Sequence, residues 1–264
     1  MSRPASTRAS LIFLALTLLG FLAASSAPTP LYHLYQEQLQ FSPAVLTLIF
    51  GVYAFSLLAA LLTVGSLSDY LGRKPVIFAA LLLNMLAMLL FISADSVAWL
   101  ISARLIQGFA TGMATSVLGA ALLDFDRRQG PLITSVAPLL GMACGALGCG
   151  LLAEFAPLPL QLTYWLLLGL FLAQAVYLWR LAESVSPQPG AWRSLRPTLH
   201  VPPQARQALW RVLPLDLAAW AVGGFYLSLA PSLVRAATGS TSNLIGGALV
   251  AVLTLSGALA IYLL

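Results

Sequence analysis

Between two long apolar segments the chain reads Gly65-Ser66-Leu67-Ser68-Asp69-Tyr70-Leu71-Gly72-Arg73-Lys74-Pro75. Asp69 and Arg73 are four residues apart, so their side chains can pair if this turn is helical. Gly72 permits a tight reversal of the backbone, and Pro75 suits the first turn of a helix. A turn that only carried charge would account for Arg73 and Lys74, but not for the glycines and the aspartate around them.

The composition places this loop in a membrane protein. The chain is 60% hydrophobic and 8% charged, whereas soluble domains are about 25% charged. The apolar residues fall in blocks of roughly 20, the length that crosses a hydrocarbon core. The blocks lack the alternation of a membrane β-barrel. The sequence therefore predicts an all-α membrane protein.

Eight membrane spans are predicted from these blocks. The first begins with two arginines before an apolar run, as a signal peptide does, but its apolar character continues to Leu34. The last block runs to Leu264 without a flanking charge, so we expect the chain to be part of a longer protein. The predicted spans are 9–31, 43–66, 75–94, 97–123, 131–153, 160–181, 211–234 and 241–264.

One long polar segment divides the spans into two groups. Residues 183–210 contain five prolines and three arginines and cannot form a span. Two helical bundles joined by such a linker are a common transporter layout. We therefore expect a six-helix N-terminal bundle over 1–182, a cytoplasmic linker over 183–210, and the first two helices of a second bundle over 211–264.

The basic residues predict the orientation. Cytoplasmic loops are enriched in Lys and Arg, and only one orientation puts nearly all of them on one side. It places the N-terminus in the cytoplasm and leaves Arg235 outside and Arg104 within a span. The net charge of +5 then faces anionic lipid, and no basic stripe interleaved with aromatics suggests nucleic acid. The residues on the cytoplasmic side are Arg3, Arg8, Arg73, Lys74, Arg127, Arg128, Arg180, Arg193, Arg196, Arg206 and Arg211.

The charged loop resembles the signature between the second and third helices of the major facilitator superfamily, G-x-L-x-D-x-x-G-R-K. The matching residues are Gly65, Leu67, Asp69, Gly72, Arg73 and Lys74. The loop departs from the signature at Tyr70, where the family often has Arg or Lys. The resemblance implies a fold of two six-helix bundles, of which this chain holds about eight spans, in a plasma membrane such as the bacterial inner membrane. It also implies that Asp69 and Arg73 belong to a gating loop that latches the bundles in the outward-facing state.

The fourth predicted span contains a charged residue, Arg104. An ionised side chain within a span is costly, so it should face a wet cavity or a partner; the alternative is an arginine that snorkels to the outer interface. Arg104-x-x-Gln107-Gly108 resembles the fourth-helix motif of the family, R-x-x-Q-G, whose arginine is associated with proton coupling. Helical spacing places one face along Arg104, Gly108, Thr111 and Thr115, with Gln107 and Gly112 beside it.

The fifth predicted span is rich in glycine. Small residues four apart let helices cross closely, and Gly141, Gly145 and Gly148 follow Pro138 at nearly that spacing. The run also resembles the antiporter motif of the family, G-P-x-x-G-G, but Ala146 and Cys149 replace two of its residues.

One acidic residue, Asp216, lies early in the seventh predicted span. It lies either at the cytoplasmic interface beside Arg211 or in the cavity as a proton site.

No cofactor or metal site is predicted. Cys144 and Cys149 lie on different faces of a helix, His33 and His200 are isolated, and no cluster has metal-ligand spacing. The sequence also has no P-loop.

These observations and the resemblance predict a secondary transporter and not an enzyme. We expect a proton-coupled exporter of a small organic molecule that works by alternating access, with substrate, protons and the lipid bilayer as its partners. The alternatives are a nutrient or sugar importer of the same fold and a non-transporting sensor or assembly subunit. The oligomeric state is not predicted.

Overall fold

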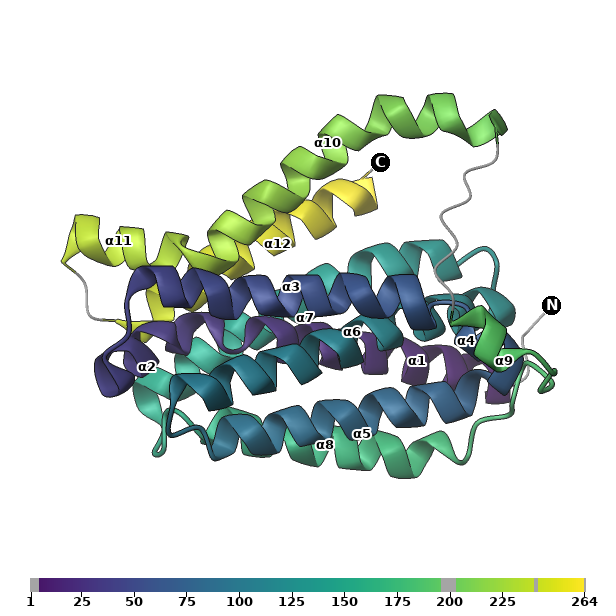
Figure 1. Cartoon of the computed structure of the whole chain (residues 1–264), viewed down its shortest axis with the longest axis horizontal. Helices are drawn as coiled ribbons and strands as arrows, with labels where there is room; N and C mark the ends of the chain where they lie inside the picture. Colours follow the sequence, from purple (N-terminus) through teal and green to yellow (C-terminus); the bar gives the residue numbers. More distant parts are fainter. Residues whose placement is uncertain (1–4, 196–202, 240–241, 264) are drawn as a thin grey trace.

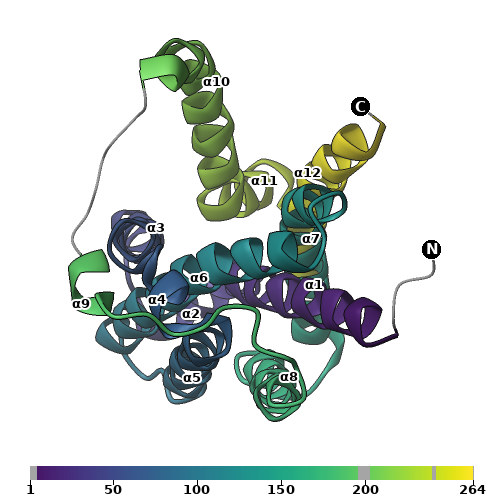
Figure 2. The ribbon, with the colours of Figure 1, turned by 90° about the vertical axis from the view of Figure 1, so that its right-hand side faces the viewer.

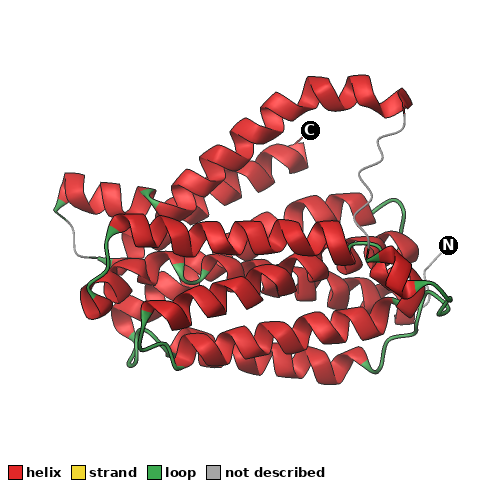
Figure 3. Cartoon of the chain, in the orientation of Figure 1, coloured by secondary structure: helices red, strands yellow, loops and turns green. Residues whose placement is uncertain are grey.

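The computed structural model describes residues 5–195, 203–239 and 242–263, and every regular element in these ranges is a helix (Figure 3). Of the residues named above, Arg3, Arg196, His200 and Leu264 lie outside these ranges. The elements are α1 (Ala5–Ser26), η1 (Thr29–Leu31), α2 (Tyr32–Leu39), α3 (Pro43–Val64), α4 (Leu67–Leu71), α5 (Arg73–Ile92), α6 (Val97–Phe125), α7 (Gly130–Phe155), α8 (Leu162–Leu178), α9 (Ala191–Ser194), α10 (Pro203–Ser228), α11 (Ala230–Thr238) and α12 (Asn243–Leu263).

The described helices match the predicted spans in number. Six stretches are long and apolar enough to cross a membrane, and the bent pair α10–α11 makes a seventh. The eighth, α8, is apolar but has 17 residues, or about 26 Å at 1.5 Å per residue. It is shorter than the predicted span 160–181.

The first span is broken by prolines. The helix α1 ends at Ser26, and η1 and α2 continue the apolar path to Leu39. Pro28 and Pro30 have no N–H, so the carbonyls of Ala24 and Ser26 lose the donors that a continuous helix would supply. The end of α1 therefore needs hydrogen-bond donors from another element.

Six long helices (α1, α3, α5, α6, α7 and α8) form the main bundle (Figures 1 and 2). α6 packs along α3 and α5, and α1 packs along α7. Phe91 stacks on Tyr164 with ring centroids 4.6 Å apart, and Phe78 contacts Trp179 at 5.5 Å, which ties α5 to α8. We call the end that holds α4 and α9 the α4 end, and the opposite end, which holds α2 and α11, the α2 end (Figure 1).

Many large apolar side chains lie on the outside of the molecule. Phe55, Phe155 and Trp220 are 75%, 77% and 76% exposed. A water-soluble monomer rarely carries so much exposed apolar surface. These side chains suit contact with hydrocarbon, as expected for a chain that spans a membrane.

The linker and the seventh span differ from the prediction. α10 begins at Pro203, inside the predicted linker 183–210, and the short helix α9 also lies in that linker. Pro203 can begin a helix because the first N–H groups have no helical acceptor. Within the predicted span 211–234, the chain bends by 55° between α10 and α11. Pro231 follows the bend at once, and its missing N–H interrupts the hydrogen-bond ladder there.

The helix α12 packs along α7. A Cβ added at Gly247 would strike the backbone carbonyl of Ala146, so the two backbones are in direct contact. At the α2 end, the N–H of Asn243 donates to Glu154 Oε2 at 2.7 Å. The C-terminal helices are thus joined to the main bundle through α7, while α10 diverges from α3 toward the α4 end (Figure 1).

Candidate functional site

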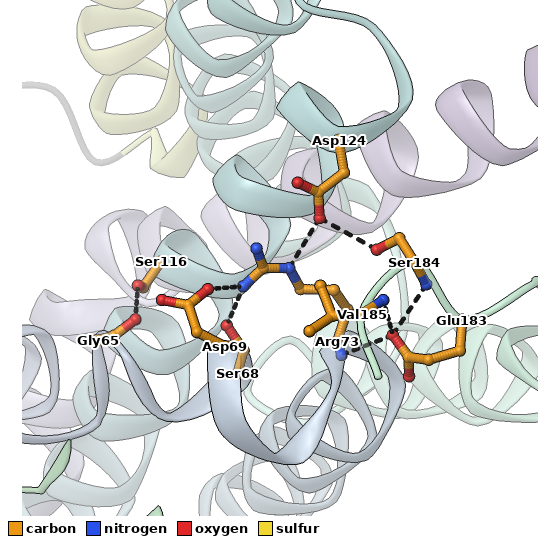
Figure 4. Close-up of polar contacts among 9 residues, drawn as sticks. All are labelled: Gly65, Ser68, Asp69, Arg73, Ser116, Asp124, Glu183, Ser184 and Val185. Atoms are coloured by element: carbon orange, nitrogen blue, oxygen red, sulfur yellow. Dashed lines mark hydrogen bonds and ion pairs between the residues drawn. The ribbon is translucent and has the colours of Figure 1, made fainter. Parts of the chain in front are cut away.

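Arg73 holds the charged loop together at the α4 end (Figure 4). Its Nη1 donates to Asp69 Oδ1 at 2.5 Å and to Ser68 Oγ at 2.7 Å, both in α4. Its Nε donates to Asp124 Oδ2 at 2.9 Å, at the end of α6. Arg73 is 8% exposed, but the side chains of Asp69 and Asp124 are 57% and 31% exposed, so solvent and salt still screen both ion pairs in part. The loop is therefore tied to α6 as well as to itself.

Glu183 and Lys74 cap two helix ends reciprocally. Glu183 Oε1 accepts from the N–H of Arg73 at 2.8 Å, and Oε2 accepts from the N–H of Lys74 at 2.9 Å. In return, Lys74 Nζ donates to the carbonyl of Leu181 at 2.8 Å, just beyond α8. A helix N-terminus favours an anion and a C-terminus favours a cation. The start of α5 and the end of α8 are stabilised by the same pair of residues.

Gly72 makes this arrangement possible. Its backbone angles, φ +93° and ψ 159°, are rarely adopted by residues that have a side chain. A Cβ there would also lie 2.9 Å from Glu183 Oε2. Gly65, at the start of the loop, is held from α6, because Ser116 Oγ donates to its carbonyl at 2.7 Å.

The start of the linker lies along the charged loop. The N–H of Gln188 donates to the carbonyl of Tyr70 at 2.8 Å, and Ser66 Oγ donates to the carbonyl of Ser194 at 3.3 Å. A ring carbon of Tyr70 lies 3.4 Å from the Cβ position of Gly190. Tyr70, where the loop departs from the family signature, therefore contacts the linker instead of adding a charge to the loop.

Arg104 is buried in the bundle and is 1% exposed, so it does not snorkel to the outer interface. Nη1 donates to the carbonyl of Ser25 at 2.9 Å and to Gln107 Oε1 at 2.7 Å. Nε donates to Tyr32 Oη at 2.9 Å, and Nη2 also donates to this oxygen. The guanidinium carbon lies 5.1 Å from the ring centroid of Tyr53. Among the described residues no carboxylate pairs with Arg104, so its partners are neutral dipoles and aromatic faces.

Gln107 and Arg104 donate to two carbonyls at the end of α1. Gln107 Nε2 donates at 2.9 Å to the carbonyl of Ala24, which has no helical donor because Pro28 lacks an N–H. Arg104 takes the next carbonyl, that of Ser25. The positive charge also complements the negative end of the α1 dipole. The pair on α6 therefore fixes the position of the break in the first span.

The other candidate residues in the fourth span, which forms α6, make different contacts. Thr111 is fully buried, and its hydroxyl donates to the carbonyl of Gln107 in its own helix at 2.8 Å. A Cβ at Gly108 would strike the carbonyl of Tyr53, and one at Gly112 would lie 2.5 Å from the carbonyl of Leu57. Gly108 and Gly112 thus lie against α3, whereas Arg104 and Gln107 lie against the end of α1.

Only some of the glycines in the fifth span, which forms α7, lie in close helix contacts. Gly141 and Gly145 lie against the backbone of Leu19 and Ala23 in α1, but a Cβ at Gly148 would meet nothing within 4 Å. Gly148 is therefore not in a close helix contact. Asp216 is exposed on α10.

Two residues that accept hydrogen bonds from Arg73 were not predicted from the sequence. Asp124 directly follows the fourth predicted span, and Glu183 is the first residue of the predicted linker. Both are acidic residues predicted at the same membrane face as Arg73, which could have indicated them as its partners. Sequence spacing alone, however, does not show that these helix ends lie next to one another. Within the described ranges, no group of three or more His, Cys, Asp or Glu residues could hold a metal.

Solved structures with this fold are helical membrane transporters. The human organic anion transporter MFSD10 (TETRAN) aligns with a TM-score of 0.69 and 21% identity over 98% of this chain and 72% of that one. A bacterial homologue of the human lysosomal transporter Spinster, inward-facing and unoccupied, aligns with a TM-score of 0.67 and 15% identity over 95% of this chain and 61% of that one. At these identities the likeness establishes the fold alone.

The fold and the charged loop define a multi-span transporter scaffold. The chain belongs to the Major Facilitator Superfamily, whose family model matches residues 12–264. It is similar to the multidrug resistance protein MdtL of Citrobacter koseri, with 32% identity over 114 residues. The MdtL of Escherichia coli is 31% identical over 132 residues. These stretches cover 40% and 47% of this chain, and 29% and 32% of the length of the two relatives.

Proposed function

We propose that the protein exports a small organic molecule in exchange for protons, by alternating access of a site between two helical bundles. The observation that carries this proposal is Arg104, a buried cation that holds the broken end of the first span and has no carboxylate partner in the described part of the chain. A charge kept within a span at such cost is commonly functional. The similarity to proteins named multidrug resistance proteins supports export of drug-like compounds.

In this proposal the charged loop acts as the gate between the two bundles. The hydrogen bonds described above hold this loop to α6 and to Glu183. The loop residues concerned are Gly65, Asp69, Gly72, Arg73 and Lys74. A latch requires an element with two discrete arrangements. The ion pairs of Arg73 supply one of them, and their loss when the bundles move would supply the other.

The coupling role belongs to Arg104 and Gln107, with Thr111 and Asp216 as further candidates. Because Arg104 and Gln107 hold the carbonyls of α1, a movement of Arg104 during the transport cycle would also change how firmly the break in α1 is held. Asp216 is an exposed carboxylate twelve residues before the end of α10. At that depth a carboxylate needs a water-filled path, which fits a proton or cation site.

Transport by the full-length protein in proteoliposomes tests this proposal. We expect a pH gradient to drive drug flux, and Arg104→Ala to reduce it at least tenfold. Arg127→Ala, which removes an exposed charge from a loop, is the matched control. A panel of cationic, neutral and anionic compounds would define the substrate.

Three results would contradict parts of the proposal. Unchanged gradient-driven flux in Arg104→Ala would exclude its coupling role. Flux in the same direction as the protons would indicate an importer, and no flux for any compound would favour a sensor or assembly subunit.

We also propose that the protein lies in a bacterial inner membrane with its N-terminus, and hence the α4 end, in the cytoplasm. Protease protection of an N-terminal tag in sealed vesicles tests that orientation.

A further inference from the structure

The outer face of α8 carries an open groove of about 420 Å³. Its small side chains, Gly169 and Ala173, are four residues apart, and a Cβ at Gly169 would meet nothing within 4 Å. Larger apolar side chains border these positions. The ring of Tyr177 also contacts Phe13 of α1 at a centroid distance of 4.9 Å. The residues lining the groove are Gly169, Leu172, Ala173, Val176, Tyr177 and Arg180.

The groove has the length of one membrane leaflet. Gly169 and Leu178, the last residue of α8, are nine residues apart, about 14 Å along a helix, and Arg180 lies in the turn that follows. Half of the hydrocarbon core is about 15 Å thick. The apolar part of the groove is therefore long enough to follow an acyl chain through one leaflet, with Arg180 at its end.

Arg180 supplies charge that the protein itself does not neutralise. Its side chain is exposed and stacks on the ring of Tyr177, with 5.7 Å between the guanidinium carbon and the ring centroid. Within the described ranges the guanidinium has no hydrogen bond or ion pair. A guanidinium has five N–H donors, and phosphate accepts two of them side by side. Trp179, which is 65% exposed, adds an aromatic ring of the kind found at membrane interfaces.

We propose that this groove binds an anionic phospholipid, with an acyl chain along Gly169–Val176 and the phosphate on Arg180. The apolar floor and the unpaired cation match the two parts of such a lipid and lie at the corresponding depths. A basic site at the cytoplasmic ends of membrane helices is a recognised setting for anionic headgroups. This proposal does not depend on which compound is transported.

Native mass spectrometry of the full-length protein tests the site, after release from bilayers with equal phosphatidylglycerol and phosphatidylcholine. We expect one phosphatidylglycerol to be retained. Arg180→Gln should weaken its retention about fivefold, as expected for one basic residue at a membrane surface. The double variant Gly169→Leu with Ala173→Leu should abolish it by filling the groove. Arg127→Gln, which removes a charge from an exposed loop, should leave retention unchanged.

Each other outcome overturns the proposal. Equal retention of both lipids, or full retention by Arg180→Gln, would remove the role of charge. A dimer that dissociates in the double variant would show that a second copy of the chain occupies the groove. Circular dichroism of each variant verifies the fold. If the double variant does not fold, the comparison of Arg180→Gln with Arg127→Gln still decides the question.

Discussion

Glu183 and Lys74 cap each other's helix ends. The carboxylate accepts from the N–H of Lys74 at 2.9 Å, and the ammonium donates to the carbonyl of Leu181, two residues before Glu183, at 2.8 Å. The pair joins the end of the sixth span to the start of the third. Since the N–H groups of a helix start are otherwise without partners, the charged loop depends on a residue that the family signature does not contain.

Glu183→Ala should lower the stability of the protein. The N–H groups of Arg73 and Lys74 would lose their acceptor, and the loss of a helix cap costs about 1 kcal/mol. Thermal unfolding in detergent, followed by circular dichroism, measures the change. Glu37→Ala removes an exposed carboxylate from α2 and is the matched control. Equal melting temperatures for the two variants would contradict the cap.

Gly72→Ala should be more harmful than its size suggests. The positive φ costs about 1–3 kcal/mol for a residue with a side chain, and the added Cβ would also displace Glu183. Gly51→Ala adds the same methyl group where nothing lies within 4 Å. We expect a lower melting temperature for the first variant and no loss for the second. A tolerated Gly72→Ala would show that the loop can adopt another conformation.

Gln107→Leu should destabilise the break in the first span. It removes the donor to the carbonyl of Ala24 and an acceptor of Arg104, and a buried polar group left without a partner costs about 1–3 kcal/mol. A double-mutant cycle with Arg104→Lys measures the coupling between the two residues. We expect non-additive changes in melting temperature, because both side chains hold the same helix end. Additive changes would show that the residues act independently.

Gly145→Ala should lower the stability of the protein, whereas Gly148→Ala should not. A Cβ at residue 145 would overlap the backbone of Ala23, whereas one at residue 148 has open space. Alanine without a clash favours a helix over glycine by about 0.5–1 kcal/mol. We therefore expect a lower melting temperature for Gly145→Ala and an equal or higher one for Gly148→Ala. The same sign for both would contradict the close packing of α7 on α1.

The sequence predicted the parts of the fold that depend on local pattern. Apolar block length placed the spans, and the spacing of Asp69 and Arg73 predicted an ion pair that the structure contains. The bend before α11 was missed, although Pro231 was visible. A proline interrupts a hydrogen-bond ladder, but the direction and size of a bend depend on neighbouring helices.

The candidate site was predicted less completely, because its partners come from distant parts of the chain. Arg104 was identified as a buried charge, but its partners depend on where α1 breaks. Asp124 and Glu183 contact Arg73 only because the ends of three helices meet. Spacing along one helix gives no information on such a meeting.

The contacts of the linker with the charged loop set a limit on domain movement. Residues from Glu183 to Leu195 are held at the α4 end by Arg73, Tyr70 and Ser66, and Leu195 packs against the bundle core. Pro203, where α10 begins, is eight residues beyond Leu195, so the two residues lie at most about 29 Å apart. While these contacts hold, the start of α10 cannot move farther than this from Leu195.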